Sequence, residues 1–326
     1  MPGADLAAAK PVIVIGGPTA GGKSSLALAI ARAFAGTVIN ADSMQVYRDL
    51  PILTAQPDAA DQAAVPHRLY GLLPLDDICS AARWSDLALA EIAAAHAGGR
   101  LPILVGGTGL YLRSLMQGLS PIPSVSPEHR QAAQRLFSEI GVTGLHTRLA
   151  AEDPEMARRL HPHDSQRVMR AWEVLQATGT SLASWQAVPA VPPTDLRFQS
   201  WVVLPPRERL YAACDRRFQT MIEHGALDEV EATLARYGRA ILEEPSGKAL
   251  GFRDLADVLA GRQALERAIA AAQQATRNYA KRQTTWFRHQ MAFANFISEI
   301  GTKENFSESS YQKIFQNIRD FVLTPN

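Results

Sequence analysis

The chain has 326 residues, of which 47% are apolar and 20% charged, a composition ordinary for a globular protein with a sizeable core. This composition excludes a wholly disordered or fibrous protein. Because 33 Lys and Arg residues stand against 32 Asp and Glu residues, the net charge is +1. That balance excludes a uniformly basic nucleic-acid coat protein but allows a local basic patch. At roughly 150 residues per domain, the length predicts about two domains.

Cysteine usage and hydropathy indicate the compartment. Two cysteines, Cys79 and Cys214, are too few for a disulfide framework or a four-thiolate zinc site, and they favour a reducing compartment. The sequence holds no run near the ~18 consecutive apolar residues of a membrane span. Its first ten residues lack the basic and apolar segments of a signal peptide. We therefore expect a cytoplasmic protein that makes no membrane contact.

The first predicted elements form a strand–loop–helix–strand unit. Residues 12–15, VIVI, are β-branched and precede a glycine, which is typical of a buried strand in a parallel sheet. A glycine-rich turn at 16–23, a helical stretch at 24–34 and a second strand at 37–40 follow. This order predicts a right-handed crossover and a parallel sheet.

The turn in that unit fits a phosphate-binding motif. Residues 17–24, GPTAGGKS, match G-x-x-x-x-G-K-[ST] between a strand and a helix. The glycines let backbone N–H groups approach phosphate oxygens, Lys23 supplies positive charge, and the Ser24 hydroxyl can ligate Mg²⁺. A chance glycine-rich turn is the alternative. The motif predicts a polyphosphate site with Mg²⁺ as cofactor, made by Gly17, Pro18, Thr19, Ala20, Gly21, Gly22, Lys23 and Ser24.

Further along, the pattern changes twice at proline-rich stretches. A helix at 81–96, a third strand at 102–105 and a glycine turn at 106–109 come first, and a linker at 119–130 ends this part. Residues 128–186 read as helical with turns at Gly141 and Gly179, and a second proline-rich stretch covers 187–195. A strand at 198–204 then resumes the sheet, helices follow from Arg207, and a short amphipathic helix covers 311–321.

The order of elements predicts an α/β fold: a P-loop core with a parallel sheet flanked by helices, plus a helical insertion domain. The core comprises residues 1–120 and 196–326, and the insertion comprises residues 121–195. The alternative is one continuous domain that carries a proline-rich surface loop at each of the two places.

The position of the acidic residues narrows the chemistry. P-loop ATPases usually carry an Asp at the end of a later strand to hold Mg²⁺, but the third predicted strand ends ILVGGTG. The acid that the pattern brings nearest to the loop is Asp42, after the second strand. This arrangement disfavours an ATPase and favours a transferase in which one carboxylate takes a proton from the acceptor. Small-molecule kinases share it, so the pattern alone does not separate the two.

Seven separate motifs run along the chain: GPTAGGKS (17–24), NADSMQVY (40–47), PHRLY (66–70), VGGTGLYL (105–112), HPHDSQRVMR (161–170), KALGFRD (248–254) and KRQTTWFR (281–288). With these motifs in this order, the chain closely resembles the bacterial tRNA dimethylallyltransferase family, also called tRNA isopentenyl-diphosphate transferase. The resemblance covers nearly the whole length. It implies transfer of a dimethylallyl group from dimethylallyl diphosphate to the exocyclic N6 amine of the tRNA adenosine immediately 3′ of the anticodon.

The resemblance assigns roles at the reacting centre. Asp42 is implied as the base that takes the amine proton, with a helix N-cap or an outer ligand of Mg²⁺ as the alternatives. Ser43 and Gln45 have groups suited to reading the adenine edge. The phosphate loop holds the diphosphate leaving group rather than ATP, and Thr19, Lys23, Ser24 with Mg²⁺, Thr108 and Arg217 are the expected donors to it. Asp42, Thr108 and Arg217 are therefore the predicted catalytic residues, although Arg216 stands beside Arg217.

A second set of residues is predicted to contact the tRNA anticodon stem-loop. The enzyme must extract the target base from the stacked loop, which requires phosphate contacts and stacking surfaces. Residues 267–297 contain no acid and interleave basic with aromatic side chains, although an ordinary basic helix face with core aromatics would read alike. For residues 166–170, the alternative to a tRNA contact is an ordinary solvated helix face. The predicted set is Asp42, Ser43, Met44, Gln45, Arg130, Gln166, Arg167, Val168, Met169, Arg170, Lys248, Ala249, Leu250, Gly251, Phe252, Arg253, Lys281, Arg282 and Arg288.

Two departures and three rival functions accompany the resemblance. Residues 53–57 read LTAQP where the family usually has G-T-A-K-P, and residues 248–253 read KALGFR where R-x-V-G-Y-R is common. The rivals are a P-loop small-molecule kinase, an isopentenyltransferase acting on free AMP, and a non-catalytic RNA-binding module with a relic phosphate loop. We expect a monomer.

Overall fold

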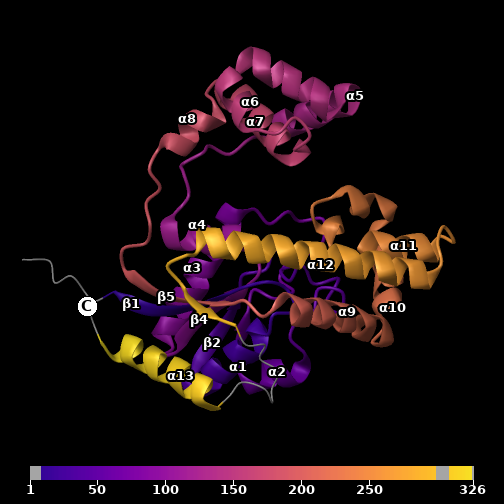
Figure 1. Cartoon of the computed structure of the whole chain (residues 1–326). Coiled ribbons are helices and arrows are strands. Elements are labelled where there is room, and N and C mark those ends of the chain that lie inside the picture. The colour runs from indigo at the N-terminus through magenta and orange to yellow at the C-terminus, as the bar shows by residue number, and fades with distance from the viewer. Residues whose placement is uncertain (1–8, 299–307, 325–326) are drawn as a thin grey trace, which may run out of the picture. The chain divides into compact units, whose positions relative to one another are not determined.

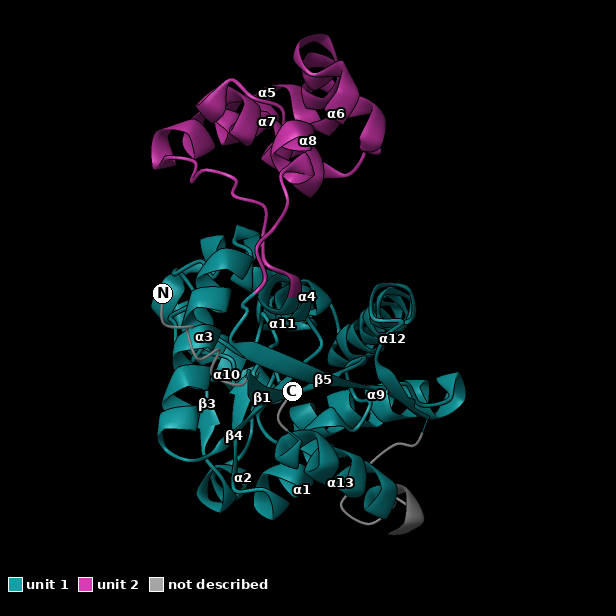
Figure 2. Ribbon diagram, turned by 90° about the vertical axis from the view of Figure 1, so that its left-hand side faces the viewer, with its two compact units in different colours: residues 1–116, 193–326 teal, residues 117–192 magenta. Residues whose placement is uncertain are grey.

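The computed structural model describes residues 9–298 and 308–324. The chain divides into two compact units, an α/β unit of residues 1–116 and 193–326 and a helical unit of residues 117–192 (Figure 2). The boundaries expected from the sequence, after residues 120 and 195, fall four and three residues beyond these divisions.

One parallel sheet organises the α/β unit. Every strand pair in the described residues is parallel, as predicted, and the strand order is β3-β2-β4-β1-β5-β6. The strands β1 and β2 of the predicted crossover unit are not neighbours, because β4 lies between them. The strands are β1 (Lys10–Gly16), β2 (Gly36–Asn40), β3 (His67–Arg68), β4 (Leu101–Gly106), β5 (Leu196–Val203) and β6 (Asn295–Ile297).

Alternate side chains of the central strands enter two different cores. Val12 and Val14 of β1 pack on one face of the sheet, whereas Ile13 and Ile15 pack on the other. Burial on both faces explains why the strand reads as a continuous apolar run. The first face is covered by α3 (Ala81–Ala97) and α4 (Gly109–Gln117), and the second by α1 (Lys23–Ala33) and α13 (Glu308–Leu323) (Figure 1).

The helices after β5 form a layer that extends the first core. The long helix α12 runs along this layer in Figure 1, and its side chain Phe287 is fully buried. The prediction that the chain stays helical from Arg207 to the last helix is wrong at one place, because β6 pairs with the end of β5. The layer contains α9 (Arg207–Glu223), α10 (Ala226–Tyr237), two 3-10 turns (Arg239–Glu243 and Ser246–Lys248), α11 (Phe252–Leu259) and α12 (Leu265–Gln290).

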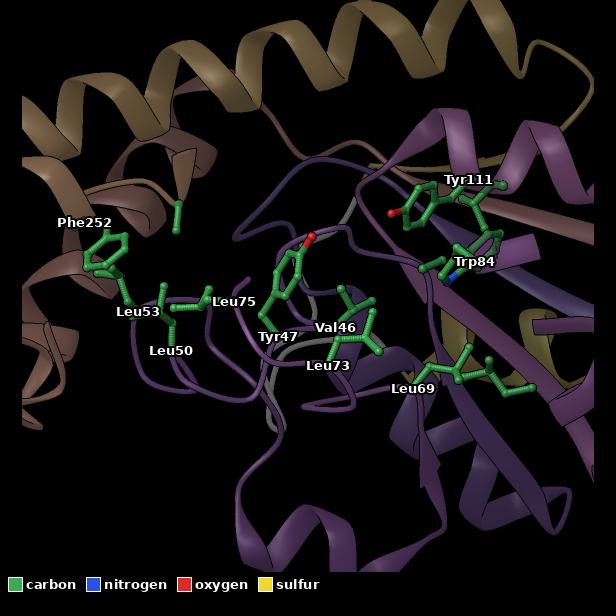
Figure 3. Close-up of a cluster of buried hydrophobic side chains, with 14 of the residues drawn as sticks. Val46, Tyr47, Leu50, Leu53, Leu69, Leu73, Leu75, Trp84, Tyr111 and Phe252 are labelled. Carbon is green, nitrogen blue, oxygen red and sulfur yellow. The ribbon is translucent and has the colours of Figure 1, made fainter. Parts of the chain in front are cut away.

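This layer also holds the loop that follows β2. Leu50 and Leu53 belong to the same buried cluster as Phe252 and lie beside it in Figure 3. The carboxylate of Glu229 on α10 accepts the backbone N–H groups of Ile52 and Leu53, at 2.6 and 2.9 Å. Burial raises the pKa of Glu229, and these two hydrogen bonds oppose the rise. The loop is therefore fixed at both its apolar and its polar positions.

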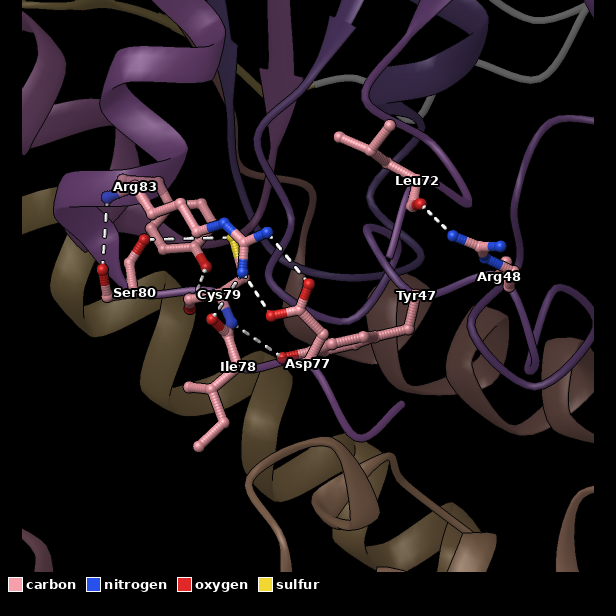
Figure 4. A network of polar contacts seen from close by, with 9 residues as sticks. Tyr47, Arg48, Leu72, Asp77, Ile78, Cys79, Ser80 and Arg83 are labelled. Atoms are coloured by element: carbon pink, nitrogen blue, oxygen red, sulfur yellow. Dashed lines mark hydrogen bonds and ion pairs between the residues drawn. The ribbon is translucent and has the colours of Figure 1, made fainter. Parts of the chain in front are cut away.

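The segment between β3 and α3 is fixed by polar contacts. Ser80 caps α3 by accepting the backbone N–H of Arg83, and the Arg83 guanidinium pairs with Asp77 (Figure 4). The Tyr47 hydroxyl accepts the backbone N–H of Cys79 at 3.3 Å. These contacts join the loop after β2 to the start of α3. A short helix, α2 (Ala59–Ala64), which the sequence pattern did not predict, precedes β3.

The helical unit has its own core, built around Leu145, Leu149, Val168 and Trp172. The helical prediction for residues 128–186 is confirmed, with a break at Gly141 inside α5 and an end of α7 at Gly179. The predicted linker is too long at its end, because Pro127 occupies the first turn of α5 after the N-cap Ser126. The helices are α5 (Pro127–Glu152), α6 (Pro154–Arg159), α7 (Ser165–Thr178) and α8 (Leu182–Ala187).

Candidate active site

The phosphate loop connects β1 to α1 in a conformation that only its residue types allow. Gly17 has φ near +143°, and a Cβ there would lie 2.4 Å from the carbonyl oxygen of Val203 on β5. Gly22, the N-cap of α1, is left-handed with φ 88°. The Lys23 ammonium folds back over the loop and donates to the Pro18 carbonyl at 2.7 Å. This arrangement leaves backbone N–H groups and a helix N-terminus at the loop, as an anion site requires.

Two cations with perturbed pKa values lie at the loop. Arg217 on α9 donates to the Thr19 hydroxyl at 2.5 Å. Burial lowers the pKa of Lys23 to about 8 and also lowers the pKa of Arg217, and the charge of Asp42 opposes both shifts. Arg216 is exposed, so of the two neighbouring arginines it is Arg217 that reaches the loop.

Asp42 lies at the carboxyl end of β2 in a tight local turn. Its backbone N–H donates to the Asn40 side chain at 2.8 Å, and its carboxylate accepts the N–H of Met44 at 2.9 Å. No helix begins here, so Asp42 is not a helix N-cap. A Cβ at Gly106 would come within 2.0 Å of the Ala41 carbonyl, which shows how closely β4 approaches the residue before Asp42.

Thr108 joins the glycine turn after β4 to the Asp42 loop. Its hydroxyl accepts the backbone N–H of Ser43 at 2.9 Å and lies 3.2 Å from the Ser43 hydroxyl. The geometry thus places Thr108 beside the predicted base. Both hydrogen-bond donors of Gln45 are used inside the protein, on the carbonyls of Thr54 and Ala55, so this side chain holds its own loop.

The sequence interpretation missed Gln283, a buried residue of α12. Its amide oxygen accepts the backbone N–H of Thr19 at 2.8 Å, and its amide nitrogen donates to the Gly107 carbonyl at 2.9 Å. One turn later Trp286 packs against the backbone of Gly109. The signal for Gln283 is a large polar residue in the otherwise small or apolar buried row of the helix, which reads Ala268, Ala272, Thr276, Ala280, Gln283 and Phe287.

The opposite face of α12 is exposed and basic. Lys281, Arg282 and Trp286, with Asn278 and Thr285, line a depression of about 480 Å³. Lys281 and Arg282 are exposed, as is Arg288 further along the helix. The acid-free run of the sequence is not acid-free in space, because Arg277 pairs with Asp215 of α9. Phe287 is a core residue, in agreement with the alternative weighed for the aromatics.

The segment 248–253 exposes only part of its predicted contact set. Ala249, Gly251 and Phe252 are buried, so their side chains support the fold. Lys248 and Arg253 are exposed, and Arg253 pairs with Glu243 at 2.9 Å. The charged members are therefore the ones whose side chains reach solvent.

Within the helical unit, the predicted contacts are again divided by burial. Arg130 and Gln166 are exposed, and the Arg167 side chain is 77% exposed, 3.5 Å from Asp164. Arg170 lies 3.4 Å from Glu173. Val168 is fully buried in the core of the unit, and Met169 is half-buried.

The site is compatible with Mg²⁺ held jointly with a phosphate. Across residues 9–298 and 308–324 no cluster of three His, Cys, Asp or Glu side chains is suited to bind a metal ion. Ser24 is exposed at the start of α1 and lines a small cavity of about 90 Å³. Mg²⁺ keeps several waters and binds through few protein groups plus substrate phosphates, so one hydroxyl fits this mode.

The fold and the site define a P-loop protein of the α/β class whose phosphate loop faces a carboxylate at the end of β2. The chain belongs to the IPP transferase family, whose model matches residues 45–290. This match begins after the phosphate loop and Asp42. None of the described helices is both long and apolar enough to cross a membrane.

Named relatives and solved structures agree with that family. The chain is 60% identical over 290 residues to the tRNA dimethylallyltransferase of Rhodospirillum centenum, covering 88% of this chain and 91% of the relative. The chain is also 54% identical to the tRNA dimethylallyltransferase of Paramagnetospirillum magneticum, covering 96% of this chain and 98% of the relative. The tRNA isopentenylpyrophosphate transferase structure from Bacillus halodurans gives 32% identity, a TM-score of 0.68 and 96% coverage of both chains. A eukaryotic dimethylallyltransferase acting on tRNA gives 26% identity and a TM-score of 0.81, covering 96% of this chain and 79% of that one.

Proposed function

We propose that the protein is a tRNA dimethylallyltransferase. It transfers the dimethylallyl group of dimethylallyl diphosphate to the exocyclic N6 amine of the adenosine immediately 3′ of the anticodon and releases diphosphate. The curated relatives at 60% and 54% identity bear this enzyme name. Their coverage of nearly the whole chain supports the same reaction here, and a P-loop kinase or an AMP-specific enzyme has no such support.

The observation that carries the proposal is the neighbourhood of one carboxylate and two half-buried cations at the sheet edge. Asp42 raises the pKa of both Lys23 and Arg217 against the larger effect of burial. Lys23 folds over the phosphate loop and Arg217 donates to Thr19 within it. An anionic leaving group and a proton acceptor therefore have sites beside each other.

Each group has a role in the reaction. The bond from the allylic carbon to the diphosphate oxygen breaks, the N6 nitrogen forms the new bond to that carbon, and Asp42 takes the N6 proton. A base so placed contributes typically ~10²–10⁴-fold. Lys23, Arg217 and the loop N–H groups stabilise the charge that develops on the leaving oxygen. Thr108 orients the Ser43 backbone next to the base. When bound at Ser24, Mg²⁺ supplies further neutralisation of the diphosphate.

The RNA is held by exposed cations rather than by the half-buried cations of the phosphate loop. Lys281, Arg282 and Trp286 offer two charges and a stacking surface on one face of α12. Aromatic and basic side chains are the groups that bind splayed, single-stranded bases. Further contacts come from Lys248 and Arg253, and from Arg130, Gln166 and Arg167 of the helical unit. We expect a cytoplasmic protein, since tRNA is the substrate, and we expect it to be a monomer.

The decisive experiment locates the nucleoside that receives a labelled dimethylallyl group. The protein is incubated with labelled dimethylallyl diphosphate, Mg²⁺ and unmodified tRNA, and the RNA is digested to locate the labelled nucleoside. Parallel reactions replace tRNA by AMP, and dimethylallyl diphosphate by ATP. Label on the adenosine next to the anticodon supports the proposal. Label on AMP alone, or phosphoryl transfer from ATP, would overturn it.

A further inference from the structure

The amide of Gln283 connects three segments that are distant in the sequence. The side chain is 5% exposed and comes from the buried face of α12. It accepts a hydrogen bond from Thr19 of the phosphate loop and donates one to Gly107 of the turn after β4. A buried amide is tolerated when its polar atoms are paired, and here both ends have a partner.

The position of Gly107 is matched to this amide. A Cβ at Gly107 would lie 2.2 Å from the Gln283 amide nitrogen, a distance that Cβ atoms in proteins essentially never show. The same point lies 3.4 Å from a carboxylate oxygen of Asp42. The amide of Gln283 therefore occupies a slot that a side chain at 107 would fill, directly beside the proposed base.

Thr19 is held at two atoms by two different helices. Gln283 of α12 takes its backbone N–H, and Arg217 of α9 donates to its hydroxyl. Because N–H groups of this loop are what bind an anion, the conformation of Thr19 sets the shape of the site before diphosphate arrives. Preorganised donors are the ones that stabilise developing charge most effectively.

We infer that Gln283 is a positioning residue for the diphosphate: its amide fixes Thr19 against Gly107 and so holds the phosphate loop in its binding conformation. This inference rests on the proposed function. The two faces of α12 then have different roles: Gln283 positions the diphosphate site, and Lys281 and Arg282 contact the RNA.

The first test removes the amide while keeping the length of the side chain. Gln283→Met leaves the Thr19 N–H and the Gly107 carbonyl without their partner, so the phosphate loop is no longer held in its binding conformation. We expect the KM for dimethylallyl diphosphate to rise roughly tenfold, as it does when the binding conformation is populated about a tenth of the time, with the Kd for tRNA within about twofold. The matched control is Thr276→Val, because this buried hydroxyl on the same helix face bonds only Ala272 of its own helix.

The second test approaches the same contact from the other side. Gly107→Ala places a methyl group where the Gln283 amide lies, and the amide is the flexible end of a side chain that can move away. If Gly107→Ala raises the KM for dimethylallyl diphosphate by displacing Gln283, adding Gly107→Ala to Gln283→Ala raises this KM little further. A double-mutant cycle on the KM for dimethylallyl diphosphate measures this coupling.

The outcomes separate cleanly. A KM within twofold of wild type in folded Gln283→Met, or effects of Gly107→Ala and Gln283→Ala that multiply fully in the double variant, would overturn the positioning role. If the Gln283 variants do not fold, Gly107→Ala decides alone, since a KM within twofold of wild type in that variant would overturn the positioning role. If the wild-type protein transfers no dimethylallyl group, the proposed function fails. Binding of inorganic pyrophosphate to the same variants then still tests the role of Gln283.

Discussion

The cations of the phosphate loop differ in kind from those on the outer face of α12. Lys23 and Arg217 are desolvated, and burial lowers the pKa of each, whereas Lys281 and Arg282 are exposed to solvent. A charge in a site of low dielectric interacts strongly with one nearby partner, and an exposed charge is screened by salt within about 10 Å. The first pair therefore suits a single leaving group at a fixed place, and the second suits a polyanion held by many weak contacts.

The strongest way to break this comparison is to remove the carboxylate that faces the buried cations. Asp42→Asn keeps the size of the side chain and abolishes the base. We expect the single-turnover rate of transfer to fall by about 10²–10⁴-fold, the typical contribution of a positioned base, while the Kd for tRNA changes little. Asp86→Asn, an exposed carboxylate on α3, is the matched control. Wild-type turnover by Asp42→Asn would remove Asp42 from the chemistry.

Arg217 provides the next largest effect, because it is half-buried and bonded to Thr19. Arg217→Gln should reduce kcat/KM for dimethylallyl diphosphate by roughly 10²–10³-fold, as the loss of one preorganised donor does. The neighbouring Arg216→Gln is a close control, since Arg216 is exposed and carries the same charge. Steady-state kinetics with tRNA saturating measures both. Equal losses in the two variants would show that net charge, rather than burial, is responsible.

How much of this site follows from the sequence depends on how local its signals are. The phosphate loop and Asp42 were predictable because each lies within a few residues of the strand that positions it. Gln283 was not, since its partners Thr19 and Gly107 are 264 and 176 positions away in the chain. The periodicity of α12 does not predict which distant backbone groups the buried amide of Gln283 hydrogen-bonds.

The same reasoning explains the errors in the fold. The strands β3 and β6 have two and three residues, too few for any alternation to show, and both lie at the edges of the sheet. The insertion of β4 between β1 and β2 is a long-range choice that the crossover rule does not specify. By contrast, the longer helices were predicted, because the turns between them, such as the one at Gly179, are encoded locally.

The pH dependence sharpens the contrast at a smaller scale. The pKa of Lys23 is about 8, so the ammonium is charged below pH 8 and loses its proton as the pH rises through that value. If the diphosphate binds only the charged form, the KM for dimethylallyl diphosphate should rise about tenfold between pH 7 and pH 9. Measuring KM at fixed Mg²⁺ and saturating tRNA over this range checks it. In Lys23→Met the KM should be high throughout and lack this rise. A KM that is flat in the wild type contradicts a role for the Lys23 charge.

The smallest effect belongs to a single exposed charge on α12. Arg282→Gln removes one cation from the face that also holds Lys281 and Trp286. It also removes the stacking of the guanidinium over the Tyr279 ring, whose centroid lies 5.6 Å from the Arg282 Cζ. We expect tRNA binding to weaken only severalfold near physiological salt, and the slope of log K against log salt to fall by about 0.7–0.9, the value for one phosphate contact. The KM for dimethylallyl diphosphate should not change.

Arg267→Gln, on the first turn of the same helix, is the control for net charge, because it removes an exposed arginine that lies about three turns or more along the helix from Lys281, Arg282 and Trp286. Filter binding of tRNA at four salt concentrations gives both slopes. If Arg282→Gln and Arg267→Gln lower the slope equally, the RNA responds to the charge of the whole helix rather than to this face. If only Arg282→Gln lowers it, the two faces of α12 divide the two substrates between them, because Gln283 is the adjacent residue in the chain and faces the phosphate loop.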